Sequence, residues 1–412
     1  MTDTNSLPAG RQAQKIDEIL TRGVENIFPN RDLFEQLLKT GRKIRIYHGI
    51  DPTGKLHVGH MVAFRKLRQF QDMGHEIIIL FGGFTATIGD PTDKKATRQP
   101  LTRKQVLVNA KDYKKQIGKI LDLRKSNIRF LNNEKWTNKL KPADLFELAS
   151  RFTVARLLER DMFQERIKAG KDISASEFLY PVLQAYDSVT MDVDVEIGGN
   201  DQTFNMLAGR DLMKKMRNKE KFVLATKLLV DPTGKKMGKT EGNMVNLDEN
   251  ADQMFGKIMS WPDGVITLGL EILTDIPMSE IVQDAKAISE GTANPKDIKI
   301  KLAKNIISVF HGEKEAEKAE EEFNKIHRDR ELPSDMPVFE TDKGNYFIAD
   351  LLCDTKLSVS KNEAKRLVEG GGVETIIGDK KERVTDWRKE IILEDGMIIK
   401  VGSRKFVKIV LK

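Results

Sequence analysis

The sequence KIRIYHGIDPTGKLHVGHMVAFRKLRQFQDMG, residues 43–74, predicts a strand, a tight loop and a helix in succession. Ile44 and Ile46 lie on one face of a strand at 43–48, and the Asp-Pro and Thr-Gly pairs at 51–54 favour a turn. Apolar residues at helical spacing then predict a helix that ends at Gly74. The start of such a helix attracts anions, because its first N–H groups lack partners and its dipole is positive there. The stretch therefore predicts a phosphate-binding turn.

Two histidines occupy the predicted start of this helix. His57 and His60 are three residues apart, so they share one face of the first turn. Gly59 has no side chain, so a flat base or a ribose can approach the backbone between them. Taken alone, the pattern is equally compatible with a helix start that carries two polar residues, and a second motif is needed to choose.

That second motif is KMGKT, residues 236–240, which follows a strand candidate at 222–230 and a turn at 231–234. Its lysines lie on a glycine-containing loop that can fold onto a triphosphate and neutralise charge on a leaving pyrophosphate. We set a P-loop aside, because that motif needs four residues between its glycines and only three separate Gly234 from Gly238.

HVGH at 57–60 with KMGKT at 236–240 resembles the HIGH and KMSKS motifs of the class I aminoacyl-tRNA synthetases. Within that class, YPVLQAYD at 180–187, GGNDQ at 198–202 and Tyr47 are similar to the amino-acid pocket of the tyrosyl-tRNA synthetases. The final segment resembles the S4 RNA-binding domain that bacterial and organellar tyrosyl enzymes carry. The resemblance covers nearly the whole chain, and it is specific because these motifs agree with one another.

The resemblance implies a role for particular residues in activating tyrosine with ATP. The catalytic residues that it implies are His57, His60, Lys94, Arg98, Lys236, Lys239 and Thr240. The ATP-binding residues that it implies are Asp51, Thr53, His57, Gly59, His60, Asp201, Lys236 and Lys239. The tyrosine-binding residues that it implies are Tyr47 and Asp187 at the substrate phenol, Asp90, Tyr180 and Gln184 around the α-amino group, and Gln202 near the carboxylate.

The reaction implied by the resemblance has two steps and serves protein synthesis. The tyrosine carboxylate attacks the α-phosphate of ATP, giving tyrosyl-AMP and pyrophosphate, and the tyrosine then passes to the 3′-terminal adenosine of tRNA(Tyr). The attacking carboxylate is already ionised, so the first step needs positioning and charge stabilisation, with no protein nucleophile or general base. We expect ATP to enter with Mg²⁺, and we expect the protein to hold no structural metal.

Composition sets the broad class of the protein. The chain has 412 residues, of which 39% are hydrophobic and 32% charged, and no apolar run approaches the length of a membrane span. A single cysteine, Cys353, excludes an intramolecular disulfide and a cysteine-cage zinc site. MTDTNSLPAG at the start has neither an apolar signal core nor an Arg-rich pattern, so we expect a cytoplasmic protein. The net charge of +7 is compatible with a nucleic-acid partner.

We expect an α/β fold in which a Rossmann-like doubly wound parallel sheet forms a catalytic domain at residues 1–245. A helical insertion at about 134–190 interrupts this domain, and the resemblance assigns it to the interface of a homodimer. A helical domain on the anticodon side is expected at 246–330, followed by a proline-bearing linker at 331–344. Residues 11–30, with apolar side chains at helical spacing, are predicted as one helix.

Residues 345–412 are predicted as a small α+β domain of the S4 type. Ser360 is a suitable N-cap for a helix in which Lys361 and Lys365 share one face, with Arg366 beside them. These three residues can contact tRNA phosphates, although a solvated helix surface would carry similar charges. The S4 resemblance favours the RNA interpretation.

Two other functions stay open from the sequence. A tryptophanyl synthetase shares the class and fold, but it should lack the S4 domain and the phenol pair of Tyr47 and Asp187. A non-catalytic RNA-binding protein on a synthetase scaffold should have lost residues of the HVGH or KMGKT motif, and both motifs are present here.

Overall fold

A computed structural model describes residues 9–89, 102–237, 244–327, 336–378, 380–402 and 405–412. Five of the predicted site residues lie outside these described residues: Asp90, Lys94, Arg98, Lys239 and Thr240. The chain divides into two compact units, one made of Met1–Asn250 and Lys257–Gly312 and the other of Ala251–Gly256 and Glu313–Lys412.

The first unit is built on a six-stranded sheet with the strand order β1-β6-β5-β2-β3-β4. Its strands are β1 (Val24–Phe28), β2 (Arg45–Ile50), β3 (Glu76–Phe81), β4 (Ile128–Asn132), β5 (Val195–Gly199) and β6 (Phe222–Thr226). All neighbours are parallel except β1, which pairs antiparallel with β6 at one edge. Because β2 lies beside β5, the winding of the sheet reverses between these two strands. The predicted Rossmann-like doubly wound sheet is therefore confirmed.

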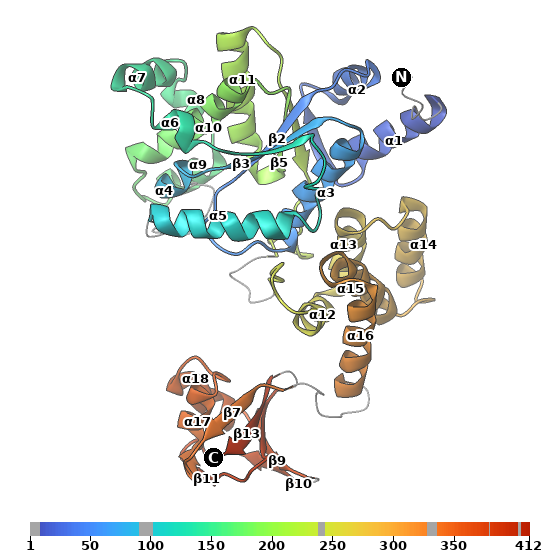
Figure 1. The fold of residues 1–412 in the computed structure, drawn as a ribbon, viewed down its shortest axis with the longest axis vertical. Coiled ribbons are helices and arrows are strands. Elements are labelled where there is room, and N and C mark those ends of the chain that lie inside the picture. The colour runs from blue at the N-terminus through green and yellow to red at the C-terminus, as the bar shows by residue number, and fades with distance from the viewer. Residues whose placement is uncertain (1–8, 90–101, 238–243, 328–335, 379, 403–404) are drawn as a thin grey trace. The chain divides into compact units, whose positions relative to one another are not determined.

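Helices cover both faces of this sheet, as its buried strands require. They include α3 (Val58–Asp72) and α5 (Arg103–Ile117) on one face and α10 (Ala175–Met191) and α11 (Thr203–Arg217) on the other. Figure 1 shows α5 and α11 on opposite sides of the strands. On the α3 face, His48 meets the ring of Phe64 edge-on at 5.6 Å. The next residue of β2, Tyr47, points to the other face and joins a buried cluster with Met191.

The N-terminal segment differs from the single helix predicted over residues 11–30. Helix α1 (Ala9–Thr21) ends early, Gly23 takes a left-handed φ of +66°, and the chain continues into β1. Val24 and Ile27 have helical spacing relative to the helix, but they belong to a strand whose partner, β6, lies about two hundred residues later in the sequence. Pairing with a distant strand overrides the local pattern.

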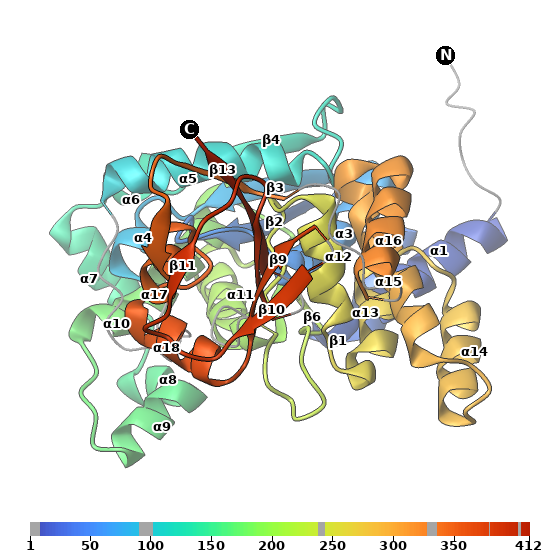
Figure 2. The same cartoon turned by 90° about the horizontal axis from the view of Figure 1, so that it is seen from below.

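The other helices of the first unit flank the sheet on two sides. They are α2 (Arg31–Lys39), α4 (Thr85–Ile88), α6 (Glu134–Thr137), α7 (Pro142–Ser150), α8 (Val154–Leu158), α9 (Asp161–Lys168), α13 (Ile266–Leu273), α14 (Met278–Ser289) and α15 (Pro295–His311). Figures 1 and 2 show α7 to α9 on the opposite side of the central strands from α13 and α14. Arg22 fastens α13 by donating to the carbonyls of Leu270, Glu271 and Thr274.

The second unit has a sheet and a core of its own. Its elements are α16 (Glu313–His327), β7 (Val338–Thr341), β8 (Asn345–Phe347), α17 (Ile348–Asp354), α18 (Lys361–Glu369), β9 (Val373–Ile377), β10 (Lys380–Val384), β11 (Glu390–Ile392), β12 (Ile398–Val401) and β13 (Lys405–Leu411), with α12 (Ala251–Met259) shared between the units. The main sheet has the order β10-β9-β12-β13-β7. Leu352, Val368 and Ile399 are among its fully buried core residues. Strand β7 falls in the range 331–344, where the sequence predicts a linker.

Within the described ranges, every helix is too short or too polar to cross a membrane. The same residues contain no group of three or more His, Cys, Asp or Glu side chains arranged to hold a metal ion.

Candidate active site

The predicted motifs converge at the point where the winding of the sheet reverses. The HVGH turn follows β2, and the one-turn helix η1 (Asn200–Gln202) follows β5, the strand beside it. In a doubly wound sheet, ligands bind in the crevice outside the carboxyl ends of such a strand pair. The topology therefore provides a crevice shared by two motifs that are far apart in the sequence.

The two histidines cap α3 with their own side chains. The backbone N–H of Gly59 donates to Nδ1 of His57 at 3.1 Å, and the backbone N–H of His57 donates to Nδ1 of His60 at 3.2 Å. The ring centroids are 4.0 Å apart. This is a reciprocal capping box in which imidazoles replace the usual hydroxyl and carboxylate. A ring nitrogen that accepts a hydrogen bond carries no proton, so each neutral ring has its proton on Nε2.

Both histidines are neutral at physiological pH. Burial, and then the charge of Lys236, lowers the pKa of His57 to about 4. Burial, and then the neighbouring His57, lowers the pKa of His60 well below its ordinary value. A Cβ atom on Gly59 would lie 2.9 Å from the His57 ring, so the cap requires glycine at this position. The turn thus presents two uncharged N–H donors.

Hydrogen bonds and an ion pair place the described part of the lysine motif beside this turn. Val58 donates its backbone N–H to the carbonyl of Val245 at 3.0 Å, which places the segment after the motif against the start of α3. Before the motif, Val230 forms a β-bridge with Lys236. The ammonium of Lys236 lies 2.5 Å from the carboxylate of Asp201 at the end of β5. Lys236, Asp201 and the HVGH turn therefore meet in one place.

Asp51 connects the loop after β2 to two other elements. Its carboxylate accepts from the hydroxyl of Thr85 at 2.7 Å and from the phenol of Tyr180 at 2.9 Å. The hydroxyl of Tyr113 on α5 donates to the carbonyl of Gly54 at 2.7 Å and holds the far side of the same loop. The loop is thus fixed on both sides by residues from α4, α5 and α10.

Asp187 is a buried carboxyl with two donors. The indole N–H of Trp136 donates to it at 2.7 Å, and the amide of Asn133 donates at 3.2 Å. The same amide group lies 3.3 Å from the Thr85 hydroxyl, so a continuous chain of polar contacts joins Asp187 to Asp51. Burial raises the pKa of Asp187 to about 8, against the effect of its two donors.

Tyr47 lies near Asp187 but bonds to the next residue along α10. Its side chain is fully buried, and its hydroxyl is 3.0 Å from Oγ of Ser188. Burial, together with the nearby Glu196, raises the pKa of Tyr47 well above its ordinary value. One turn earlier on α10, the amide of Gln184 donates to Glu196 at 3.0 Å.

The structure brings most of the described site residues into one region. These residues lie on β2 or β5, on the segments that follow them, on α10 or in the lysine motif: Tyr47, Asp51, Thr53, His57, Gly59, His60, Tyr180, Gln184, Asp187, Asp201, Gln202 and Lys236. Gln202 accepts from the amide of Asn205 at 2.9 Å. The sequence prediction missed Thr85, Asn133, Trp136, Ser188, Glu196 and Lys221, which hold the predicted residues in place. Two of these residues could have been found from the sequence. Asn133 directly follows the end of a predicted strand, and Glu196 is a charged residue inside an apolar strand.

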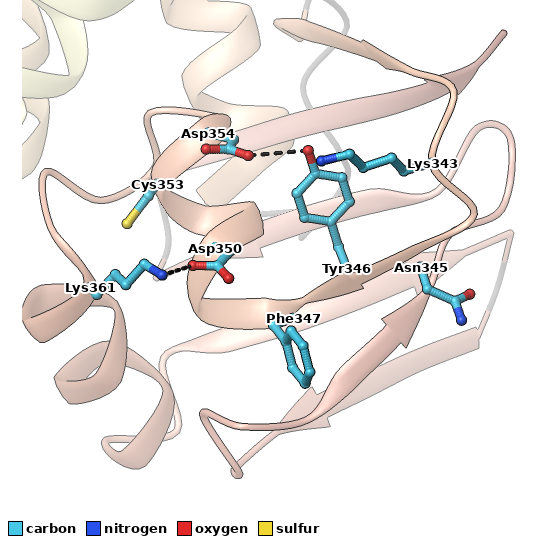
Figure 3. A pocket seen from close by; sticks show the side chains of 8 residues that line it. All are labelled: Lys343, Asn345, Tyr346, Phe347, Asp350, Cys353, Asp354 and Lys361. Carbon is cyan, nitrogen blue, oxygen red and sulfur yellow. Dashed lines mark hydrogen bonds and ion pairs between the residues drawn. The ribbon is translucent and has the colours of Figure 1, made fainter.

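The predicted RNA-contacting residues lie on α18 of the second unit. Lys361 pairs with Asp350 at 2.5 Å, and Lys365 lies over the ring of Trp387 at 5.1 Å. Lys361 also lines a pocket of about 360 Å³ with Lys343, Asn345, Tyr346, Phe347, Asp350, Cys353 and Asp354. Figure 3 shows this pocket, with the Tyr346 hydroxyl bonded to Asp354 and Lys361 bonded to Asp350. The lysines are exposed, as a surface that meets a polyanion requires.

Comparison with known proteins gives one consistent result. Residues 39–328 match the family described as tRNA synthetases class I (W and Y). The tyrosine–tRNA ligase of Thermotoga maritima is 42% identical over 394 residues, which cover 95% of this chain and 96% of that protein. Tyrosine–tRNA ligase 2 of Vibrio parahaemolyticus is 44% identical over 396 residues, covering 95% and 98%. A C-terminally truncated mitochondrial tyrosyl-tRNA synthetase of Aspergillus nidulans has a similar fold, with a TM-score of 0.62 and 23% identity over 77% of this chain and 97% of that one.

Proposed function

Because this chain belongs to the class I tyrosine–tRNA ligases, we propose that the crevice between β2 and β5 carries out tyrosine activation. L-tyrosine reacts there with ATP to give tyrosyl-AMP and pyrophosphate, and the tyrosine then passes to the 3′-terminal adenosine of tRNA(Tyr). ATP enters with its accompanying Mg²⁺ as part of the substrate. The similarity to tyrosine enzymes and the presence of the HVGH and KMGKT residues favour this function over the tryptophanyl and non-catalytic alternatives.

One observation carries the chemical part of the proposal: two neutral imidazoles and a lysine lie close together after β2. With Nδ1 of His57 and His60 occupied by backbone N–H groups, the Nε2–H groups are the donors for ATP phosphates. Lys236 adds a positive charge close to His57. Donors fixed before the reaction stabilise charge that develops on the phosphates without reorganising during the step. Lys94, Arg98, Lys239 and Thr240 are proposed to act with them, on the basis of the family motifs.

The tyrosine side of the proposed site uses the buried polar wall. Asp187 and Tyr47 are proposed to recognise the substrate phenol, and Tyr180, Gln184 and Asp90 the α-ammonium. The burial of Tyr47 and Asp187 supports this assignment, since buried polar groups discriminate strongly against a substrate that leaves them unpaired. Asp51, Thr53, Gly59 and Asp201 are assigned to ATP, and Gln202 to the tyrosine carboxylate.

We also propose a homodimer, a cytoplasmic location and tRNA contacts by the second unit. Two large apolar side chains of the insertion are exposed, Phe146 at 77% and Val154 at 68%, and association would cover them. The exposed cations on α18, Lys361, Lys365 and Arg366, are assigned to tRNA phosphates. The proposed domains are the catalytic domain at residues 1–245, the helical domain at 246–330 and the S4-type domain at 345–412, with 331–344 between the last two.

Pyrophosphate exchange into ATP, measured with each of the twenty amino acids, tests the function. We expect exchange that depends on tyrosine. Exchange that depends on tryptophan would overturn the specificity, and an absence of exchange with every amino acid would support a non-catalytic protein.

A further inference from the structure

A buried ion pair lies beneath the proposed tyrosine pocket. Lys221, directly before β6, is 0% exposed, and Glu196, on the neighbouring β5, is 1% exposed. Their ammonium and carboxylate form a close salt bridge. Removing two charges from water costs more free energy than a surface pair returns, so a pair this deep depends on further hydrogen bonds. Those hydrogen bonds lead directly to the pocket.

Lys221 has an acceptor for each of its three protons. It donates to Glu196, to Oγ of Ser188 at 3.0 Å and to the carbonyl of Met206 at 3.1 Å. Ser188 accepts from the ammonium, and its oxygen also lies 3.0 Å from the Tyr47 hydroxyl. One serine oxygen therefore connects the lysine to Tyr47.

Glu196 determines the orientation of the Gln184 amide. A side-chain amide has a donor end and an acceptor end, and a glutamine can present either one. Gln184 places its NH₂ group 3.0 Å from Oε1 of Glu196, and an ionised carboxylate can only accept. The carbonyl oxygen of Gln184 is then the end left for the substrate, and a carbonyl is the group that an ammonium requires.

Gly209 shows that this arrangement is closely packed. It lies inside α11, where glycine lowers helix stability relative to alanine. A Cβ atom there would lie 2.4 Å from Nζ of Lys221 and 2.8 Å from Oγ of Ser188. The backbone of α11 approaches the ion pair so closely that any side chain at 209 must displace it.

We propose that Glu196, held by Lys221, is a positioning residue that orients Gln184 toward the α-ammonium of the bound amino acid. Glu196 does not touch the substrate. Through Gln184 it acts on recognition of the amino group, because that group is the partner of Gln184 in the proposed function. This inference rests on the proposed function, and the experiment below distinguishes failure of the one from failure of the other.

The test compares tyrosine with 3-(4-hydroxyphenyl)propionate, which is tyrosine without its amino group. Dissociation constants of both are measured by equilibrium dialysis on the full chain, and the ratio between them reports recognition of the ammonium. In the double variant Glu196→Gln/Lys221→Met, both charges are removed together, so no unpaired charge is buried. The Gln184 amide can then turn either way, and the ratio should fall about tenfold, the scale of one hydrogen bond to a charged group.

A second variant keeps both charged residues. Gly209→Ala favours the helix but displaces Lys221, so the ratio should again fall, by several-fold. The matched control is Asp263→Asn/Lys299→Met, which removes another lysine–carboxylate pair, 2.6 Å apart, in the helical part of the first unit. This control should leave the ratio unchanged.

The possible outcomes distinguish failure of the proposed function from failure of the positioning role of Glu196. If the unmodified chain binds neither ligand and supports no tyrosine-dependent exchange, the proposed function is wrong. If the unmodified chain prefers tyrosine and both site variants keep the full preference, Glu196 does not position Gln184. Loss of thermal stability with an unchanged ratio would show that the pair supports only the fold.

Discussion

Lys236 and Asp201 form an ion pair, with Nζ and Oδ2 2.5 Å apart, that joins the lysine motif to the end of β5. The Lys236 side chain is 52% exposed and that of Asp201 is 24% exposed, so water reaches the pair and its contribution to stability is small. The ammonium can therefore exchange its carboxylate partner for a phosphate at little cost while it stays beside His57.

Lys236→Ala should lower the rate of tyrosyl-adenylate formation much more than the affinity for ATP. In the proposed function the Lys236 ammonium stabilises the negative charge that develops on the leaving pyrophosphate in the transition state. Removing one such stabilising group lowers rates by about a hundredfold or more. Single-turnover formation of tyrosyl-AMP over a range of ATP concentrations measures both quantities. Lys214→Ala, on the exposed side of α11, is the charge-matched control. A loss confined to ATP affinity would contradict the role assigned to Lys236.

His57→Asn and His57→Ala should separate capping from catalysis. Asparagine is a good N-cap and should keep α3 near its original stability, whereas alanine should cost about 1 kcal/mol. Both variants lose the Nε2–H donor, so both should be strongly impaired in pyrophosphate exchange. Thermal unfolding and exchange are measured on the same preparations. An asparagine variant with full activity would mean that the histidine serves only as a cap.

Tyr47→Phe should relax the preference for tyrosine over phenylalanine and leave ATP binding nearly unchanged. The hydroxyl is buried beside Ser188, and a pocket built for a hydroxyl penalises an analogue that leaves its polar groups unpaired. Rejection of phenylalanine by tyrosyl-tRNA synthetases is itself a familiar example of this effect. Exchange rates with the two amino acids give the ratio, and an unaltered ratio would remove Tyr47 from phenol recognition.

The pKa of Asp187, raised to about 8, predicts a pH-dependent stability. Between pH 4 and pH 8 the unfolded chain releases the Asp187 proton and the folded chain keeps it, so this residue makes folding less favourable as pH rises. Asp187→Asn resembles the protonated carboxyl. The variant should therefore gain stability relative to the unmodified chain, by up to about 1.4 kcal/mol per pH unit across this range. Denaturant unfolding at pH 5 and pH 8 measures the gain, and a constant difference would show that Asp187 is ionised when folded.

A chain that ends after α16, at residue 327, should still form tyrosyl-AMP at close to the original rate. The removed residues include the separate core of Leu352, Val368 and Ile399, whereas every described residue of the crevice precedes residue 250. The shortened chain should charge tRNA poorly, and tRNA affinity of the full chain should fall steeply with salt. Exchange and charging are compared on one preparation. Equal retention of both activities would exclude a tRNA role for the removed part, and equal loss would show that it supports the fold.

The sequence predicts well those features that depend on local patterns. The alternation at Ile44 and Ile46, the turn residues and Gly74 place the central strand–loop–helix unit within two residues of β2 and α3. The same local reasoning fails at Val24, because β1 is defined by its pairing with β6. The order of strands in a sheet depends on pairing between distant segments, and the local sequence of neither segment indicates its partner.

The candidate site also divides into residues that local motifs identify and residues that only long-range contacts bring into place. Motifs identify the residues proposed to meet ATP and tyrosine, but not the residues that orient them. Lys221 directly precedes a strand, with nothing nearby in the sequence to indicate a partner, and its contacts with Ser188 and Glu196 come from 33 and 25 residues away. Asn133 links Asp187 to Thr85 across three separate elements. Such contacts arise only when the sheet brings its strand ends together.

The pairing of β1 with β6 and of β2 with β5 has a consequence for synthesis on the ribosome. The first strands of this sheet leave the ribosome long before these partners exist, since β1 ends at Phe28 and β6 at Thr226, while β2 ends at Ile50 and β5 at Gly199. At ordinary elongation rates this interval is on the order of ten seconds or more. From the synthesis of β3 until that of β5, β2 has only one of its two neighbours. The nascent chain is then most exposed to misfolding and to chaperones, and slowing translation before residue 222 should lengthen that period.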